Sequence, residues 1–122
     1  MSLQKPSRLR RTVDLRKLVR ETRLSVDDFI RPIFVTHRNK RQEIESMPGQ
    51  FRFPLDEIEK TIAGSMKLGI NGIILFGIPK SKDETGTDTT NDNGIIQQAV
   101  RRIRGAFPEL IIITDACFCQ YT

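Results

Sequence analysis

The last part of the sequence combines two thiols and a carboxylate at a spacing that can bind a metal ion. Cys117 and Cys119 are separated by one residue, and Asp115 precedes Cys117 by two positions. Zinc prefers thiolate ligands, and a catalytic zinc usually has three protein ligands and one open position. Two cysteines do not complete that set, so a third ligand must come from elsewhere. The alternative is a pair of half-buried structural thiols, because free cysteine packs as a small hydrophobic side chain. The spacing alone leaves both interpretations open.

Two other segments contain residue types that can do chemistry. His37 is the only histidine of the chain, and no sequence neighbour offers it a partner as a base or ligand, so we favour a surface or loop histidine. The segment from Lys80 to Asp88 contains Asp83, Glu84 and Asp88 but lacks the regular ligand spacing of a calcium loop. We interpret this long polar loop as a lid over an active site.

Strands and helices alternate from about residue 30 onward, and these elements must position the candidate residues. Continuous apolar runs predict buried strands, and apolar residues at helical spacing predict amphipathic helices. The expected order is strand 30–36, helix 54–68, strand 72–76, a helix capped by Asn91 or Asp92, and strand 110–114. Residues 37–53 are expected to form a polar connection with a turn at 47–49. Gly69 is expected to end the first helix in a left-handed conformation.

This order predicts a parallel sheet covered by helices on both faces. Two architectures fit, an open doubly wound sheet and a segment of a (β/α)8 barrel, and the pattern alone does not choose between them. No Gly-x-Gly-x-x-Gly or Walker sequence supports a nucleotide fold. In both architectures the reactive edge is the carboxyl end of the strands, which the segments after Thr36, after Phe76 and at Asp115 reach.

The composition indicates a soluble globular chain. Its 122 residues are 38% hydrophobic and 29% charged, no apolar run approaches the length of a membrane span, and no signal peptide is recognisable. The net charge of +5 is concentrated in residues 5–23, which contain eight basic and two acidic residues. No aromatic residue interleaves with these charges, so a solvated arm or a contact to another subunit is favoured over nucleic-acid binding. Two cysteines without a secretion signal favour a reducing, cytoplasmic location.

Several segments, in this order along the chain, resemble the porphobilinogen synthase (5-aminolevulinate dehydratase) family. The resemblance extends from about Arg8 to the last residue. Each segment alone is weak, and their ordered combination is specific. The segments are residues 8–11 (RLRR), 18–24 (LVRETRL), 30–35 (IRPIFV), 46–49 (SMPG), 75–77 (LFG), 82–86 (KDETG), 106–108 (AFP) and 114–122 (TDACFCQYT).

The resemblance implies an α/β fold, namely the first three strands and two helices of a (β/α)8 barrel, preceded by an N-terminal arm. On this basis residues 1–29 are expected to form the basic arm, and residues 30–122 the partial barrel. The arm is expected to embrace a neighbouring subunit in a homo-oligomer, usually an octamer. The implied reaction condenses two molecules of 5-aminolevulinate to porphobilinogen with loss of water, a step of tetrapyrrole and haem biosynthesis.

The resemblance also implies roles for particular residues. Asp115 corresponds to the active-site carboxylate, Cys117 and Cys119 to two of three cysteine ligands of a catalytic zinc, and Phe76 to a residue near the substrate. The third cysteine and two lysines that form Schiff bases with the substrate lie beyond Thr122 in the family. Some relatives have other residues in place of these cysteines and use magnesium. Because this sequence has both cysteines, the resemblance implies that its metal is zinc.

Without those lysines, the 122 residues alone are expected to be inactive and to bind zinc weakly. The chain is therefore expected to be an N-terminal fragment of the enzyme. The alternative is a non-catalytic, truncated relative that acts as an interaction module. A partial barrel exposes a sheet edge and apolar faces, so self-association of the isolated piece is expected.

Overall fold

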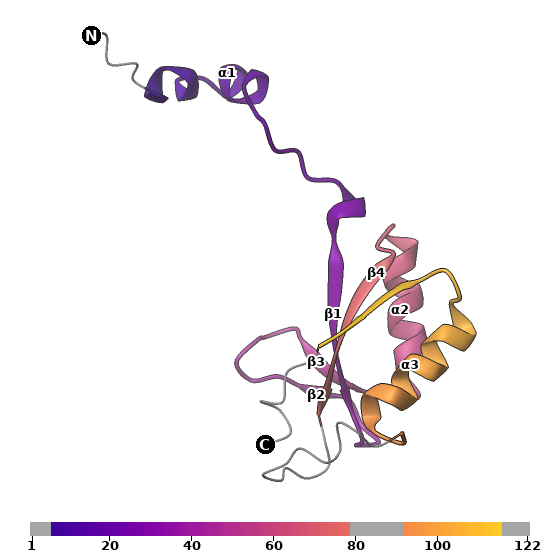
Figure 1. Ribbon diagram of the computed structural model, residues 1–122. Helices are drawn as coiled ribbons and strands as arrows, with labels where there is room; N and C mark the ends of the chain where they lie inside the picture. Colours follow the sequence, from indigo (N-terminus) through magenta and orange to yellow (C-terminus); the bar gives the residue numbers. More distant parts are fainter. Residues whose placement is uncertain (1–5, 79–91, 116–122) are drawn as a thin grey trace.

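The computed structural model describes residues 6–78 and 92–115, and these form an extended arm followed by a mixed sheet with two packed helices (Figure 1). The arm contains the short helices η1 (Pro6–Arg10), α1 (Val13–Leu18) and η2 (Val26–Asp28). The remaining elements are β1 (Ile30–Thr36), β2 (Gln42–Glu43), β3 (Phe51–Pro54), α2 (Ile58–Lys67), β4 (Gly72–Ile78), α3 (Ile95–Ala106) and β5 (Ile111–Thr114). The three predicted strands are confirmed as β1, β4 and β5, with β4 two residues longer and β5 one residue shorter than predicted.

The strands lie in the order β2-β3-β1-β4-β5. β4 pairs in parallel with β1 on one side and β5 on the other, β3 is parallel to β1, and only β2 is antiparallel to its neighbour. The carboxyl ends of the four parallel strands therefore lie at one edge of the sheet. This is the edge at which the sequence predicts the reactive residues.

Both packed helices lie on one face of the sheet, so the prediction of helices on both faces is wrong for the part of the chain that the structure describes. In Figure 1, α2 and α3 lie next to each other on the same side of β1 and β4. Side chains alternate between the faces of a strand. The members of the core cluster that are fully shielded from solvent come from that one face and from both helices: Ile33, Val35, Ile73, Leu75, Ile58, Ile62, Ala99 and Ile103.

The opposite face, which we call the open face, contains the alternate residues Phe34, Ile74, Phe76 and Ile113, and all four are only half-buried. Helices on a single face are typical of a barrel segment, in which the other face points into the barrel. A complete doubly wound sheet has helices on both faces, but each half of it, built from successive crossovers in one direction, has its helices on one face. Helix coverage of β1, β4 and β5 therefore agrees with a barrel segment but does not by itself choose between the two architectures.

The segment between β1 and α2 differs most from the prediction. The expected connection 37–53 contains β2 and most of β3, joined by the predicted turn, in which Gly49 has a φ of 81°. Pro54, expected in the first turn of the helix, is instead the last residue of β3, opposite Thr36, and α2 begins only at Ile58. Proline lacks an N–H donor, which suits the end of a strand as well as the start of a helix.

The N-termini of η2 and α3 differ in whether a side chain caps the helix. Ser25 and Asp28 form a capping box at the start of η2, in which the Ser25 N–H donates to Asp28 Oδ2 at 2.8 Å. The predicted cap of α3 is wrong as far as Asp92 is concerned, because the N-cap residue is Gly94 and no side chain caps the helix. The Asp92 carbonyl instead accepts a hydrogen bond from Arg101 at 2.7 Å. Asn91 lies outside the described residues.

Two glycines of one helix predict opposite changes in stability. Gly69, two residues after the end of α2, has a φ of 85°, and a Cβ there would lie 3.2 Å from Val26 Cγ1. Gly69→Ala is expected to lower the free energy of unfolding by about 1–2 kcal/mol, because an L-residue is strained in this conformation. Gly64 lies inside α2, and a Cβ there would meet no atom within 4 Å, so Gly64→Ala is expected to raise the free energy of unfolding by about 0.5–1 kcal/mol. Urea unfolding followed by circular dichroism measures both changes, and equal signs would contradict this assignment.

A surface ion pair joins the two helices. The Arg102 Nε donates to Glu59 Oε1 at 2.7 Å, and this hydrogen bond raises the pKa of the Arg102 guanidinium above its usual value. A raised pKa contributes stability that is lost only when the pH rises through that value. The Arg102 guanidinium is therefore expected to keep its charge, and the ion pair with Glu59 to persist, at every physiological pH.

The arm extends away from the sheet in Figure 1. None of the residues in α1 is buried, and Leu18 and Leu24 are 81% and 78% exposed. Within the described ranges, no helix is long and apolar enough to span a membrane. The arm thus exposes apolar side chains between its basic ones.

Candidate active site

The carboxyl edge of the sheet brings two of the predicted site residues to one level. Phe76 lies near the end of β4, and Asp115 directly follows β5. Thr114 is the register partner of Leu75, so Asp115 continues the strand at the level of Phe76. Asp115 is exposed to solvent and already takes part in an interaction. A carboxylate at this position can hold or transfer a proton at the rim of the open face.

Phe76 does not lie alone on the open face. Its register partner on β1 is Phe34, and the two rings stack with centroids 5.2 Å apart and an angle of 23° between their planes. Stacked rings at this distance form a favourable contact and a flat apolar surface. The sequence does not single out Phe34 as a site residue, although its alternation with the buried Ile33 and Val35 places it on the face of Phe76.

Arg52 is a second residue that the sequence does not predict in the site. It lies on β3 opposite Phe34, and register partners in parallel strands project from the same face. It also lines a hollow of about 540 Å³ beside the β2–β3 turn, together with Arg38, Glu43 and Glu45. The sequence contains no signal for this position, because the segment is expected to be a connection without strands.

The other predicted residues have different outcomes. His37 follows β1 at the same edge, is half-buried and is engaged in an interaction, as is consistent with a loop histidine. Cys117 and Cys119 lie outside the described residues, as does the predicted lid at 80–88. Residues 6–78 and 92–115 contain no group of three or more His, Cys, Asp or Glu side chains that could hold a metal ion. Zinc binding by the two cysteines therefore stays a prediction.

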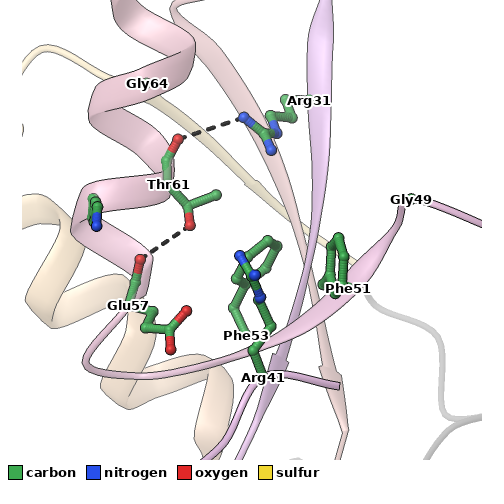
Figure 2. Close-up of a pocket in the computed structure, with 9 residues that line it drawn as sticks. Arg31, Arg41, Gly49, Phe51, Phe53, Glu57, Thr61 and Gly64 are labelled. Atoms are coloured by element: carbon green, nitrogen blue, oxygen red, sulfur yellow. Dashed lines mark hydrogen bonds between the residues drawn. The ribbon is translucent and has the colours of Figure 1, made fainter. Parts of the chain in front are cut away.

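A second hollow, of about 670 Å³, lies on the helix side of the sheet between β3 and α2 (Figure 2). Two of its arginines make contacts within the fold. Arg31 donates to the Thr61 carbonyl at 3.5 Å and to Ser65 Oγ at 2.5 Å, which ties the start of β1 to α2. The Arg41 guanidinium lies 4.5 Å from the centre of the Phe51 ring. These contacts fix β3 and α2 against β1, and so they help to position Arg52 on the opposite face of β3.

Comparisons with known proteins agree with this geometry. The family model described as delta-aminolevulinic acid dehydratase matches residues 3–122. The delta-aminolevulinic acid dehydratase of Ruminiclostridium josui is 45% identical over 121 residues, and the alignment covers 98% of this chain and 59% of that protein. The Archaeoglobus fulgidus enzyme of the same name is 47% identical over 113 residues, covering 92% of this chain and 35% of that protein.

A solved structure extends the similarity to the fold. The Toxoplasma gondii delta-aminolevulinic acid dehydratase (porphobilinogen synthase), crystallised in complex with its reaction product porphobilinogen, matches with a TM-score of 0.83. It is 26% identical in sequence, and the match covers 99% of this chain and 35% of that one. The chain thus spans between about a third and three fifths of the length of these relatives, and its sheet and helices are part of a (β/α)8 barrel. With nearly all of its residues matched by the family model, the chain belongs to the delta-aminolevulinic acid dehydratase family.

Proposed function

We propose that the protein to which this chain belongs is a porphobilinogen synthase, which condenses two molecules of 5-aminolevulinate with loss of water. The observation that carries the proposal is the arrangement of Asp115 and Phe76 at one level of the carboxyl edge, on a sheet whose open face has no helix over it in the described residues. The family match and the complex of the Toxoplasma gondii relative with porphobilinogen support it. Cytoplasmic location is part of the same proposal.

The residues of this chain would supply part of the site. Asp115 would accept or donate a proton beside the reacting substrate, where its carboxylate lies at the rim. The stacked rings of Phe34 and Phe76 would form an apolar floor that excludes water. The two amines that form Schiff bases belong to later strands of the family's barrel, so the 122 residues supply the proton-handling and binding part of the site.

The thiols of Cys117 and Cys119 would hold zinc two and four positions after Asp115. Two thiolates suit zinc better than magnesium, because soft sulfur ligands favour zinc, whereas magnesium prefers oxygen ligands. When bound with an open position, zinc polarises a substrate oxygen or lowers the pKa of a bound water. A third protein ligand is needed to complete the set, and magnesium would have a separate role if the protein binds it.

The proposal is tested by expressing the complete reading frame that contains this sequence and assaying porphobilinogen colorimetrically with 5-aminolevulinate as substrate. We expect turnover by the complete protein and none by the purified 122 residues, because the amine nucleophiles are absent from them. Absence of product from the complete, folded protein would contradict the proposal and favour a non-catalytic interaction module. Product from the 122 residues alone would show that the nucleophile lies within them.

We further propose that the arm contacts a second copy of the protein. Leu9, Val13, Leu18 and Leu24 are all more than half exposed, and apolar side chains repeated along an extended segment favour burial against a partner. Deleting residues 1–24 from the complete protein is expected to reduce the assembly to a smaller oligomer, because this apolar surface is lost. Light scattering coupled to size-exclusion chromatography measures the change, and replacing Arg8, Arg10 and Arg11 by lysine serves as a charge-conserving control. An unchanged mass after the deletion would contradict an assembly role.

A further inference from the structure

The sheet holds the two phenylalanines of the open face to different degrees. Phe34 is the register partner of Arg52 on one side and of Phe76 on the other, so paired strands lie on both sides of its backbone. Phe76 has a register partner in β1, but the pairing of β4 with β5 ends one residue earlier, at Leu75 and Thr114. Within the described residues, the backbone at Phe34 is therefore held on both sides and the backbone at Phe76 on one side.

The ring of Phe76 lacks an equivalent support from its own strand. Its neighbours on the same face of β4 are Ile74 and Ile78, which are aliphatic, and Phe76 itself is only half-buried. A half-buried phenylalanine can adopt more than one staggered side-chain conformation unless a neighbour favours one of them. The neighbour that does so is Phe34, whose ring stacks on that of Phe76 with centroids 5.2 Å apart and planes 23° apart. Such a stack is more favourable than the burial of the same apolar area without ring geometry.

The orientation of the Phe76 ring matters because of its place in the sheet. β4 lies between β1 and β5, and Asp115 continues β5 at the level of Phe76. Phe76 therefore lies between Phe34 and the position of the carboxylate. A substrate that reaches Asp115 across the open face meets this ring. The substrate 5-aminolevulinate contains methylene carbons between its polar groups, and a ring of fixed orientation offers them a flat apolar surface.

We propose that Phe34 is a positioning residue of the active site, which holds the ring of Phe76 in the orientation that binds the methylene carbons of the substrate. This inference rests on the proposed function and gives Phe34 a role that acts through Phe76. When only a fraction of the molecules has the binding orientation, the apparent affinity falls by that fraction. Loss of the Phe34 ring therefore raises KM, whereas proton transfer at Asp115 needs neither ring and kcat changes less.

The test uses the complete protein with Phe34→Leu and Phe34→Tyr. We expect Phe34→Leu to raise KM for 5-aminolevulinate about 2–10-fold, which is the contribution of one aromatic pair expressed as a change in affinity, with kcat changed less than about 2-fold. Phe34→Tyr keeps a ring that can stack on Phe76 and is expected to recover most of the affinity. Steady-state kinetics with the colorimetric porphobilinogen assay measure both constants.

A double-mutant cycle distinguishes positioning from an independent contact or a general loss of stability. Phe76→Leu removes the ring that binds the substrate and is expected to raise KM at least as much as Phe34→Leu does. In the Phe76→Leu background, Phe34→Leu is expected to raise KM by less than about 2-fold more, because no ring is left to orient. Fully additive effects would show that Phe34 acts independently of Phe76 and would overturn the inference.

The matched control is Phe51→Leu. Phe51 is also a half-buried strand phenylalanine in an aromatic pair, with its ring centroid 6.3 Å from that of Phe53, but it lines the hollow on the helix side of the sheet. Loss of this ring is expected to leave KM unchanged. An equal rise of KM in Phe51→Leu and Phe34→Leu would trace the effect to a loosened sheet and overturn the positioning role.

The remaining outcomes separate this inference from the proposed function. Unchanged KM in Phe34→Leu, with an active wild type and a raised KM in Phe76→Leu, overturns this inference alone. An inactive wild type overturns the proposed function and this inference together. If Phe34→Leu does not fold, Phe34→Met decides, because methionine fills irregular apolar space without providing a ring. It is expected to raise KM by the same factor as predicted for Phe34→Leu.

Discussion

Asp115→Asn in the complete protein is expected to lower kcat for porphobilinogen formation by about 10²–10⁴-fold, with a smaller change in KM. The amide has nearly the same size as the carboxylate but neither accepts nor donates a proton in its place, and positioned proton transfer contributes this order of rate enhancement. Asp115 directly follows β5 at the carboxyl edge and is exposed, so the substitution disturbs no buried packing. Steady-state kinetics with the colorimetric assay measure both constants.

The matched control for this variant is Glu109→Gln. Glu109 is also exposed, but it lies before β5, at the end of that strand that points away from the reactive edge. The same loss of one carboxylate there is expected to leave kcat within about 2-fold, because exposed surface substitutions have small effects. Equal losses in the two variants would show that net charge or stability is responsible. An unchanged kcat in Asp115→Asn would remove Asp115 from the mechanism.

The double variant Cys117→Ser and Cys119→Ser is expected to lose bound zinc and at least about 10²-fold of kcat. A hydroxyl is a much poorer zinc ligand than a thiolate, and a bound zinc stabilises developing charge by several kcal/mol. Zinc per subunit, measured by mass spectrometry after dialysis, is expected to fall from about one to near zero. The loss in kcat is measured on the same samples.

Metal reconstitution provides the control for that variant. Wild-type protein stripped with a chelator is expected to recover its activity when zinc is added, whereas the double variant is expected to stay inactive under the same conditions. A variant that keeps one zinc and its activity would show that the two cysteines are structural thiols, the alternative interpretation of their spacing. Recovery of the stripped wild type with magnesium but not zinc would contradict the choice of metal.

Three strands, β1, β4 and β5, and their order along the chain are predictable because the signals are local. Seven consecutive residues predict β1 with correct bounds, and the apolar run at residues 72–76 predicts most of β4. Phe34, Ile74 and Phe76 face the open side and are half-buried, while their neighbours in the strands are fully buried. Both faces of these strands are therefore apolar, and each strand appears in the sequence as a continuous apolar run. The same run therefore predicts helices on both faces, which the structure contradicts. Helix coverage depends on which neighbours are present, and periodicity does not carry that information.

The candidate site is predictable only in part, for the same reason. Asp115 is recognisable because a polar residue directly follows a buried strand, and the family resemblance singles out Phe76. Arg52 is not recognisable, since β3 is four residues long and its pairing with β1 comes from contacts across the sheet. The role of Phe34 likewise depends on its partner on β4.

The sequence by itself therefore determined the family, the positions of the main strands and the residue types available for chemistry, because each of these follows from neighbouring residues or from an ordered set of motifs. Only the tertiary structure decided which face of the sheet the helices cover and that Phe34 and Phe76 stack at the level of Asp115. Register and coverage arise from pairing between residues far apart in the chain, and a one-residue slip in pairing would move every side chain of a strand to the other face.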